Sequence, residues 1–160
     1  MIINNDIFFI KYIKMSWGDY IKNSLMNKQD ANGHVYNNVL VEAAIIGLNG
    51  AEWASAGIKV SAAEAKAAAD LLNKGSVGNT PSLTLGGKKF QITHLEKDNV
   101  IYLKIKDGGA TVAKTAQALI IGVYNTTKNF KQDGKELPQS VGMCNTVVED
   151  LANQLKSQGY

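Results

Sequence analysis

The 160-residue sequence lacks the residue patterns typical of disulfide-bonded, zinc-binding or membrane-spanning proteins. Its one cysteine, Cys144, leaves no internal disulfide to form, so a reducing, intracellular setting is expected. Neither His34 nor His94 has a cysteine or second histidine at the spacing of a zinc site. No apolar run approaches the roughly 18 to 20 residues that cross a bilayer. We therefore expect a cytoplasmic protein without metal or other cofactor.

Residue sets typical of enzymes are also missing from the sequence. It has no glycine-rich phosphate loop followed by Lys-Ser or Lys-Thr, and no Ser/His/Asp set. Cys144 falls in an apolar helical stripe, where a core residue is expected rather than a nucleophile. A net charge of +3 is too small to predict nucleic-acid binding without a clustered basic face. These absences predict a binding protein that is not an enzyme.

The length and composition fit one domain with its own core, because 45% of the residues are hydrophobic and 19% are charged. The start differs from the rest. Ile7–Ile10 is apolar, but Asp6 precedes it and lysines follow it, which does not match a secretory signal. Residues 1–14 are either an N-terminal extension, flexible or packed on the domain, or sequence upstream of a true start at Met15. We expect a single domain over residues 15–160.

Hydrophobic periodicity predicts an α+β fold. Helices are expected over 16–27, 61–74 and 144–157, and strands over 39–48, 52–55, 83–85, 90–95, 100–106, 110–116 and 118–124. The polar segments 28–38 and 125–139 are predicted to be loops. Short turns join the later strands, so the central sheet of about six or seven strands should be antiparallel. The N- and C-terminal helices should pack together on one face of this sheet, with the further helix on the other.

The first helix begins with two large aromatic residues, Trp17 and Tyr20. Ser16 and Asp19 can form a capping box around them, and the spacing of three residues puts both rings on one side of the helix. Such a pair either fills a core or forms an apolar platform for a ligand. If the terminal helices pack side by side, both rings will lie near the C-terminal Tyr160.

Four blocks of the sequence carry a family pattern. They are Met-Ser-Trp-Gly-Asp-Tyr over 15–20, Trp-Ala-Ser over 53–55, Leu-Thr-Leu-Gly-Gly-Lys-Lys over 83–89, and Cys-Asn-Thr-Val-Val-Glu over 144–149 with Gly-Tyr at the end. In this order and at these spacings the blocks resemble the profilin family, over residues 15–160. The resemblance implies a protein that binds monomeric actin, proline-rich assembly factors such as formins, and acidic phosphoinositides. It also implies that the protein promotes exchange of the nucleotide on actin without catalysing covalent chemistry.

The resemblance assigns a polyproline site to Trp17, Tyr20, Trp53, Gln154 and Tyr160. A polyproline II segment is already ordered and presents flat rings and free carbonyls, so aromatic rails with hydrogen-bond donors suit it. Gln154 stands where many members of the family carry an aromatic residue or histidine. It offers less stacking surface, which is expected to affect affinity rather than the existence of the site. With four matched rings, the ligand platform becomes the favoured interpretation of Trp17.

The resemblance also assigns an actin surface to the last helix and the adjoining strands. Its members in this sequence are Lys89, His94, Lys104, Lys106, Gly142, Asn145 and Glu149. The alternative is an ordinary solvated strand face. His94 falls where vertebrate members carry arginine, so a charged contact is weakened at neutral pH. The segment before Gly142 is longer than usual, and it either adds contacts with actin or obstructs them.

Phosphoinositide binding requires several basic side chains close together. The candidates are Lys88, Lys89, Lys104, Lys106 and Lys114, and a generic basic surface is the alternative. A profilin-like polyproline or lipid adaptor with weak or no actin binding remains the competing hypothesis for the whole protein. We expect a cytoplasmic, cytoskeletal location.

Overall fold

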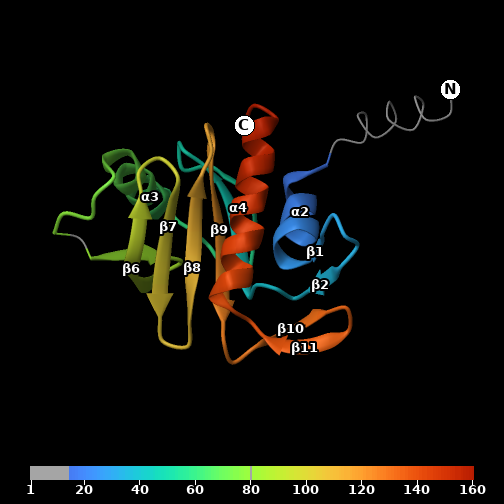
Figure 1. The fold of residues 1–160 in the computed structure, drawn as a ribbon. Helices are drawn as coiled ribbons and strands as arrows, with labels where there is room; N and C mark the ends of the chain where they lie inside the picture. The colour runs from blue at the N-terminus through green and yellow to red at the C-terminus, as the bar shows by residue number, and fades with distance from the viewer. Residues whose placement is uncertain (1–14, 80) are drawn as a thin grey trace, which may run out of the picture.

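A curled, seven-stranded antiparallel sheet forms the centre of the computed structural model, which describes residues 15–79 and 81–160 (Figure 1). The strand order is β4-β3-β9-β8-β7-β6-β5. The strands are β3 (Glu42–Gly47), β4 (Glu52–Ala56), β5 (Ser82–Leu85), β6 (Lys88–Glu96), β7 (Val100–Ile105), β8 (Gly108–Lys114) and β9 (Ala118–Asn125). The predicted α+β fold is confirmed. The predictions for residues 1–14 lie outside the described residues.

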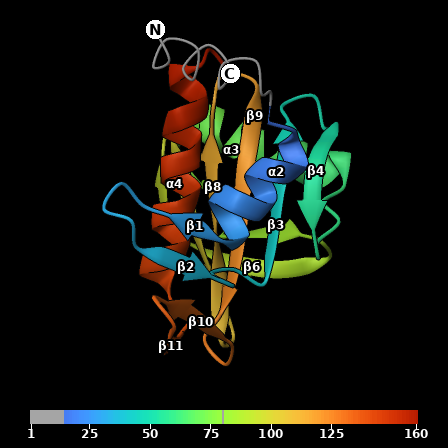
Figure 2. The same cartoon turned by 90° about the vertical axis from the view of Figure 1, so that its right-hand side faces the viewer.

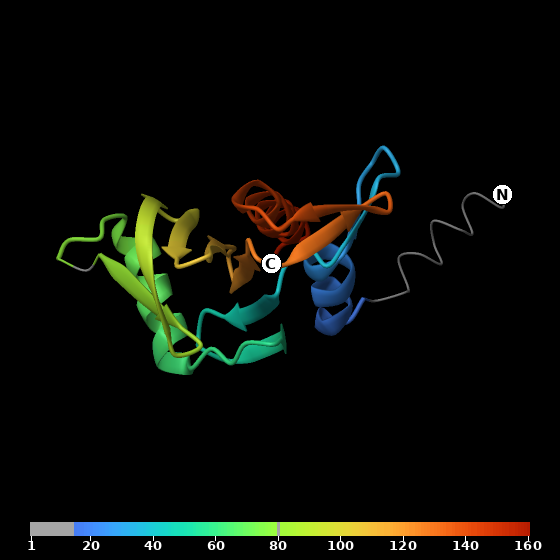
Figure 3. The ribbon, with the colours of Figure 1, turned by 90° about the horizontal axis from the view of Figure 1, so that it is seen from below.

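Helices cover both faces of this sheet. One face carries the four-residue helix α2 (Trp17–Tyr20), the π-helix η1 (Ile21–Met26) that continues it, and α4 (Val141–Ser157), as Figure 2 shows. Helix α3 (Ala62–Lys74) packs on the other face, and Figure 3 shows the sheet curling around it. The helices lie on the two faces as predicted, and each face carries its own core. None of the described helices is long and apolar enough to cross a bilayer.

Capping residues in the sequence predicted the ends of some helices correctly and missed others. Ser61 and Glu64 form the predicted capping box of α3, and Gly75 takes the left-handed conformation after it, with φ of 77°. Helix α4 begins at Val141 rather than at residue 144, because Ser140 accepts a hydrogen bond from the Met143 N–H and caps it. The first helix keeps α geometry for only one turn before it widens into η1.

The prediction of loops at 28–38 and 125–139 is wrong, because these segments pair with each other in a four-stranded sheet, the accessory sheet. Its strands are β1 (Lys28–Gln29), β2 (Val35–Asn37), β10 (Asn129–Gln132) and β11 (Lys135–Pro138), in the order β1-β2-β10-β11. Each strand is too short and polar to show a strand period. The contact between β2 and β10 joins residues about a hundred positions apart, which neither segment reveals alone.

The accessory sheet is fastened to the domain by buried and charged contacts. Phe130 is buried and Tyr36 packs against the core beneath α4. The buried Gln139 side chain donates to the Asn38 carbonyl at 2.8 Å and accepts from the Asn125 N–H at 3.0 Å. Lys28 forms an ion pair with Asp150 of α4. The accessory sheet is therefore packed firmly against the rest of the domain. It lies beside α4, below η1 in Figure 2.

Candidate functional site

Four aromatic rings from three parts of the chain form one cluster, the aromatic cluster, where α2, β4 and the end of α4 meet. The ring centre of Trp17 lies 4.6 Å from that of Trp53, 5.1 Å from that of Tyr160 and 5.5 Å from that of Tyr20. The rings of Trp53 and Tyr160 lie 6.4 Å apart. These separations are those of interacting aromatic pairs. The predicted approach of the first helix to Tyr160 is confirmed.

Local structure sets the position of each tryptophan. Ser16 and Asp19 form the predicted capping box, which fixes Trp17 in the first turn of α2. Trp53 lies in β4 just after the hairpin, close to Gly47, where an added Cβ would lie 2.9 Å from the Trp53 Nε1. Both indoles are half-buried, and neither N–H donates to any residue in the described ranges. Each indole therefore has part of its surface exposed and an N–H that no described residue accepts.

Tyr160 is held in the cluster by the turn between β8 and β9. The Gln117 N–H donates to the Tyr160 carbonyl at 2.7 Å, and the Gln117 Nε2 donates to the Gly159 carbonyl at 3.2 Å. The Tyr160 N–H in turn donates to the Leu155 carbonyl at 2.9 Å. The sequence prediction did not include Gln117, since only pairing of the strands brings it beside the C-terminus.

The other two predicted members of the polyproline site are placed differently. Tyr20 is only 8% exposed, and its hydroxyl donates to Gln158 at 3.2 Å. Its ring therefore belongs mainly to the core and packs against the ring of Trp17. Gln154 is exposed on the last turns of α4. The half-exposed rings of the cluster are those of Trp17, Trp53 and Tyr160.

A second set of predicted residues meets across β6, β7, β8 and α4. Tyr102 stacks on His94, with ring centres 5.6 Å apart, and donates from its hydroxyl to Glu149 at 2.9 Å. Thr111 donates to Asn145 at 2.6 Å. His94, Asn145 and Glu149 were predicted, whereas Tyr102 and Thr111 were not. We call these five residues, of which Thr111 is fully buried, the α4–sheet surface.

Partial burial and the Glu149 carboxylate raise the pKa of Tyr102 to about 12. Its hydroxyl therefore remains a donor at neutral pH and orients the Glu149 side chain. His94 lies 3.3 Å from Glu96, measured from Nε2 to Oε1. This part of the surface presents carboxylates to solvent beside the imidazole ring.

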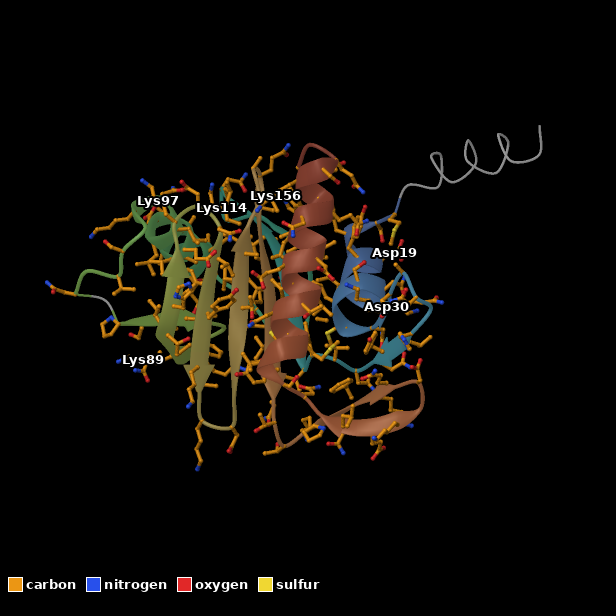
Figure 4. All side chains as sticks on the ribbon, in the orientation of Figure 1. Asp19, Asp30, Lys89, Lys97, Lys114 and Lys156 are labelled. Carbon is orange, nitrogen blue, oxygen red and sulfur yellow. The ribbon has the colours of Figure 1, made fainter. Side chains whose placement is uncertain are left out.

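The lysines predicted for actin or phosphoinositide contacts do not form one cluster. Lys89 and Lys104 project to the α4 side, because they alternate with residues buried against α3. Lys106 is exposed at the β7–β8 turn. By the same alternation Lys88 and Lys114 lie on the α3 side, where they pair with Glu42 and with Asp98, respectively. Figure 4 shows Lys89 and Lys114 toward opposite ends of the sheet.

The predicted glycine before the last helix, Gly142, is exposed in the first turn of α4. An added Cβ there would meet no atom within 4 Å, so the surface around it is open. The neighbouring Val141 is 52% exposed and is one of the most exposed large apolar side chains in the described ranges. The start of α4 thus presents a small apolar area beside Asn145.

Comparison with known proteins agrees with this arrangement. A model of the profilin family matches residues 15–160. This chain belongs to the profilin family. The structure of Acanthamoeba castellanii profilin II matches this profilin with a TM-score of 0.71 and 29% identity, covering 91% of this chain and 100% of that chain.

Two further matches have the same fold at lower identity. Mouse profilin IIa, in a complex with a double repeat from the FH1 domain of mDia1, is 21% identical, with a TM-score of 0.52 and coverage of 76% of this chain and 89% of that chain. LokiProfilin1, in a complex with rabbit actin, is 14% identical, with a TM-score of 0.53 and coverage of 73% and 83%. At these identities the likeness shows the fold alone.

The described residues of this profilin contain no group of three or more side chains placed to hold a metal ion. Cys144 is fully buried in α4, and burial raises the pKa of its thiol to about 12. Its sulfur lies 3.4 Å from both Thr111 Oγ1 and the Gly122 carbonyl oxygen. The side chain is therefore a core residue, as the sequence predicted.

Proposed function

We propose that this profilin binds monomeric actin and proline-rich segments of assembly factors at two separate surfaces. In this way it would deliver actin to those factors, promote exchange of the actin-bound nucleotide and regulate filament assembly. Membership of the profilin family supports the proposal. So do the contents of two related structures, one with a formin-type FH1 repeat and one with actin. We propose a cytoplasmic, cytoskeletal location and one profilin domain over residues 15–160 for this activity.

The aromatic cluster is the observation that carries the polyproline part. Trp17, Trp53 and Tyr160 converge from three elements, each partly exposed, and neither indole N–H is bonded within the described residues, so both could donate to prolyl carbonyls. Tyr20 supports Trp17, and Gln154 is the nearest predicted polar contact along α4. The cluster thus combines ring faces with donors, which a polyproline II segment requires.

The α4–sheet surface supports the actin part. Lys89, Lys104 and Lys106 lie along its strands, and Gly142 and Asn145 lie at the start of α4. Glu149 is oriented by Tyr102. The surface therefore offers basic, acidic and apolar contacts to a large protein partner, as many protein interfaces do.

Phosphoinositide binding has less support. Lys88 and Lys114 are paired with carboxylates, and they do not lie on the face that carries Lys89 and Lys104. We therefore propose that an acidic headgroup would use only Lys89, Lys104 and Lys106. A headgroup bound there would compete with actin.

The second candidate function is that of an adaptor that binds polyproline without actin. One residue of the α4–sheet surface favours the adaptor function. His94 stands where vertebrate members carry an arginine, and it lies beside Glu96, so a basic contact with actin would be weaker there. A pyrene-actin assay separates the two functions. Slower spontaneous nucleation at micromolar protein supports actin binding, and an unchanged nucleation rate supports the adaptor.

The aromatic cluster is tested by Trp17→Ala, measured as affinity for a fluorescent decaproline peptide. We expect affinity to fall by at least about tenfold, because the central ring of the cluster is lost. Asn23→Ala, at an exposed position of η1, is the matched control and should bind like wild type. Circular dichroism checks that both variants fold. Wild-type affinity in folded Trp17→Ala would show that the peptide binds elsewhere.

A further inference from the structure

A groove lies between α3 and the outer strand β5. Helix α3 packs on the face of the sheet opposite α4 and the aromatic cluster, as Figure 1 shows for the two helices. The volume of the groove is about 460 Å³. Ala63, Ala67, Leu71 and Lys74 of α3 form one wall, and Ser82 and Thr84 belong to the strand that forms the other. Neither the proposed actin surface nor the aromatic cluster uses these residues.

The strand side of the groove presents unpaired backbone groups. The Ile92 N–H donates to the Pro81 carbonyl at 2.8 Å, so this pair is of the hydrogen-bonded type. In an antiparallel ladder, hydrogen-bonded pairs of residues alternate with non-hydrogen-bonded pairs, so Leu83 and Phe90 also form a hydrogen-bonded pair. The backbone N–H and C=O groups of Ser82 and Thr84 therefore point outward, away from β6. In the described residues no other group bonds to these outward N–H and C=O groups. An added strand would satisfy them.

The helix side of the groove leaves room for the side chains of such a strand. Ala63 and Ala67 are exposed and lie one turn apart, and Leu71 follows after another turn. An extended segment paired with β5 would direct alternate side chains toward these residues. Because each alanine side chain ends at its methyl group, the helix leaves space here for apolar side chains such as those of valine. The groove therefore combines main-chain hydrogen bonding with room for apolar side chains.

The two ends of the groove differ in charge. Glu64 lies at the end of β5, where its carboxylate already accepts from the Gly86 and Gly87 N–H groups at 3.0 Å. Lys74 lines the opposite end, near the start of β5. Asp70 also lines the groove there, but it pairs with Lys66, whereas Lys74 forms no ion pair with any described residue. A segment antiparallel to β5 would end beside Lys74, so a terminal carboxylate there would meet a positive charge.

We propose that the α3–β5 groove binds the carboxyl-terminal end of an extended partner peptide, which adds to the sheet as a strand antiparallel to β5. Small or branched apolar side chains face Ala63 and Ala67, and the terminal carboxylate lies at Lys74. This binding is independent of actin and of proline-rich ligands, because no residue is shared with either proposed surface.

The test is an NMR titration of the ¹⁵N-labelled full chain with the probe peptide acetyl-Ser-Val-Thr-Val, with either a free carboxylate or a carboxamide end. The expected result is saturable shifts of the Ser82 and Thr84 backbone amide signals. The carboxamide form should bind about two- to fivefold more weakly, and Lys74→Gln should remove that difference. Ala67→Leu, which fills the groove, should abolish the shifts, whereas Asn73→Leu, on α3 outside the groove, should retain them.

Three results would overturn the proposal. One is the absence of saturable shifts at Ser82 and Thr84 with millimolar peptide. Another is identical shifts in the Ala67→Leu protein, which would place the peptide elsewhere. The third is a change of the same two amide signals on dilution without peptide, together with dimers in sedimentation velocity. That result would identify a second copy of this chain as the occupant of the edge.

Discussion

Tyr102 links three elements of the proposed actin surface. Its ring stacks on His94 of β6, its strand is β7, and its hydroxyl donates to Glu149 of α4 at 2.9 Å. Partial burial and the neighbouring carboxylate raise the pKa of Tyr102 to about 12, so the folded protein favours the protonated hydroxyl. This hydroxyl joins the sheet to the helix that carries Asn145 and Glu149.

Replacing Tyr102 by Phe removes that hydrogen bond and keeps the ring. We expect the free energy of unfolding in urea to fall by about 1 kcal/mol at pH 7. Because the folded pKa lies above the unfolded value of 10.0, the difference between the two proteins should be complete below pH 10 and disappear as the pH rises to about 12. Equal stability at pH 7 would show that Glu149 is held by other contacts.

Single residues in the aromatic cluster were predictable to different degrees. Trp17, Trp53 and Tyr160 stand in recognisable blocks of sequence, and the structure brings their rings together. Burial of Tyr20 could not be read from its spacing, because a ring on the same side of a helix as Trp17 can face either core or ligand. Gln117 holds Tyr160 through backbone groups, which leave no signal in the sequence.

At the scale of single elements, Glu64 joins α3 to the β5–β6 turn. Its carboxylate accepts from the Ser61, Gly86 and Gly87 N–H groups, each at 3.0 Å. Burial opposes ionisation, but these hydrogen bonds keep the pKa of Glu64 below its ordinary value of 4.5. The stabilisation is therefore fully present above pH 4.5 and is lost as the pH falls through the lowered pKa.

Glu64→Ala leaves the helix cap incomplete and two turn N–H groups without their acceptor. We expect it to lower the free energy of unfolding by about 2 kcal/mol at pH 7, measured in urea. Lys66→Ala is the control on the same helix, because its pair with Asp70 is exposed, and it should change stability by less than about 0.5 kcal/mol. A loss in Glu64→Ala no larger than that of the control would contradict this role.

The accessory sheet is held at its tip by His34 and Asp133. The His34 Nδ1 lies 2.7 Å from the Asp133 carboxylate, which also accepts from the Val35 N–H at 2.9 Å. The bond to Asp133, with help from the charge of Asp30, raises the pKa of His34 above 6.5. Hydrogen bonds from Val35 and His34 lower the pKa of Asp133 below 3.8. The ion pair thus connects β2 with the β10–β11 turn.

Asp133→Asn should lower the pKa of His34, measured by NMR titration of its ring protons. Because the folded pKa of His34 is raised and that of Asp133 is lowered, the pair stabilises the fold fully between pH 3.8 and pH 6.5, and this contribution is lost as the pH rises through the raised pKa of His34. Below pH 3.8 it is lost again as Asp133 becomes protonated. Asp150→Asn, whose partner is Lys28, should leave the titration of His34 unchanged. An unchanged pKa in Asp133→Asn would exclude the pair in solution.

Elements with a strong local period were predictable, and elements defined by distant pairing were not. The alanine-rich helix with its capping box and glycine end was predicted almost to the residue. The accessory sheet was not, because β2 and β10 have no apolar alternation and pair across more than ninety residues of sequence. Ser140 was missed as a cap because the apolar stripe of α4 begins only at Cys144.

Across the whole molecule, the two proposed surfaces use different ends of α4. Asn145 and Glu149 lie in its first half with the α4–sheet surface, whereas Tyr160 follows its last turn in the aromatic cluster. No residue belongs to both surfaces. A proline-rich partner and actin are therefore expected to bind one profilin molecule together, which is the requirement for delivery of actin to an assembly factor.

Sedimentation velocity with fluorescent decaproline peptide, actin monomer and the full chain tests this claim most directly. The account predicts that the peptide sediments with actin only when the profilin is present, and that Trp17→Ala removes the peptide while the profilin still sediments with actin. Mutual displacement of peptide and actin, or loss of actin from folded Trp17→Ala, would contradict two separate surfaces.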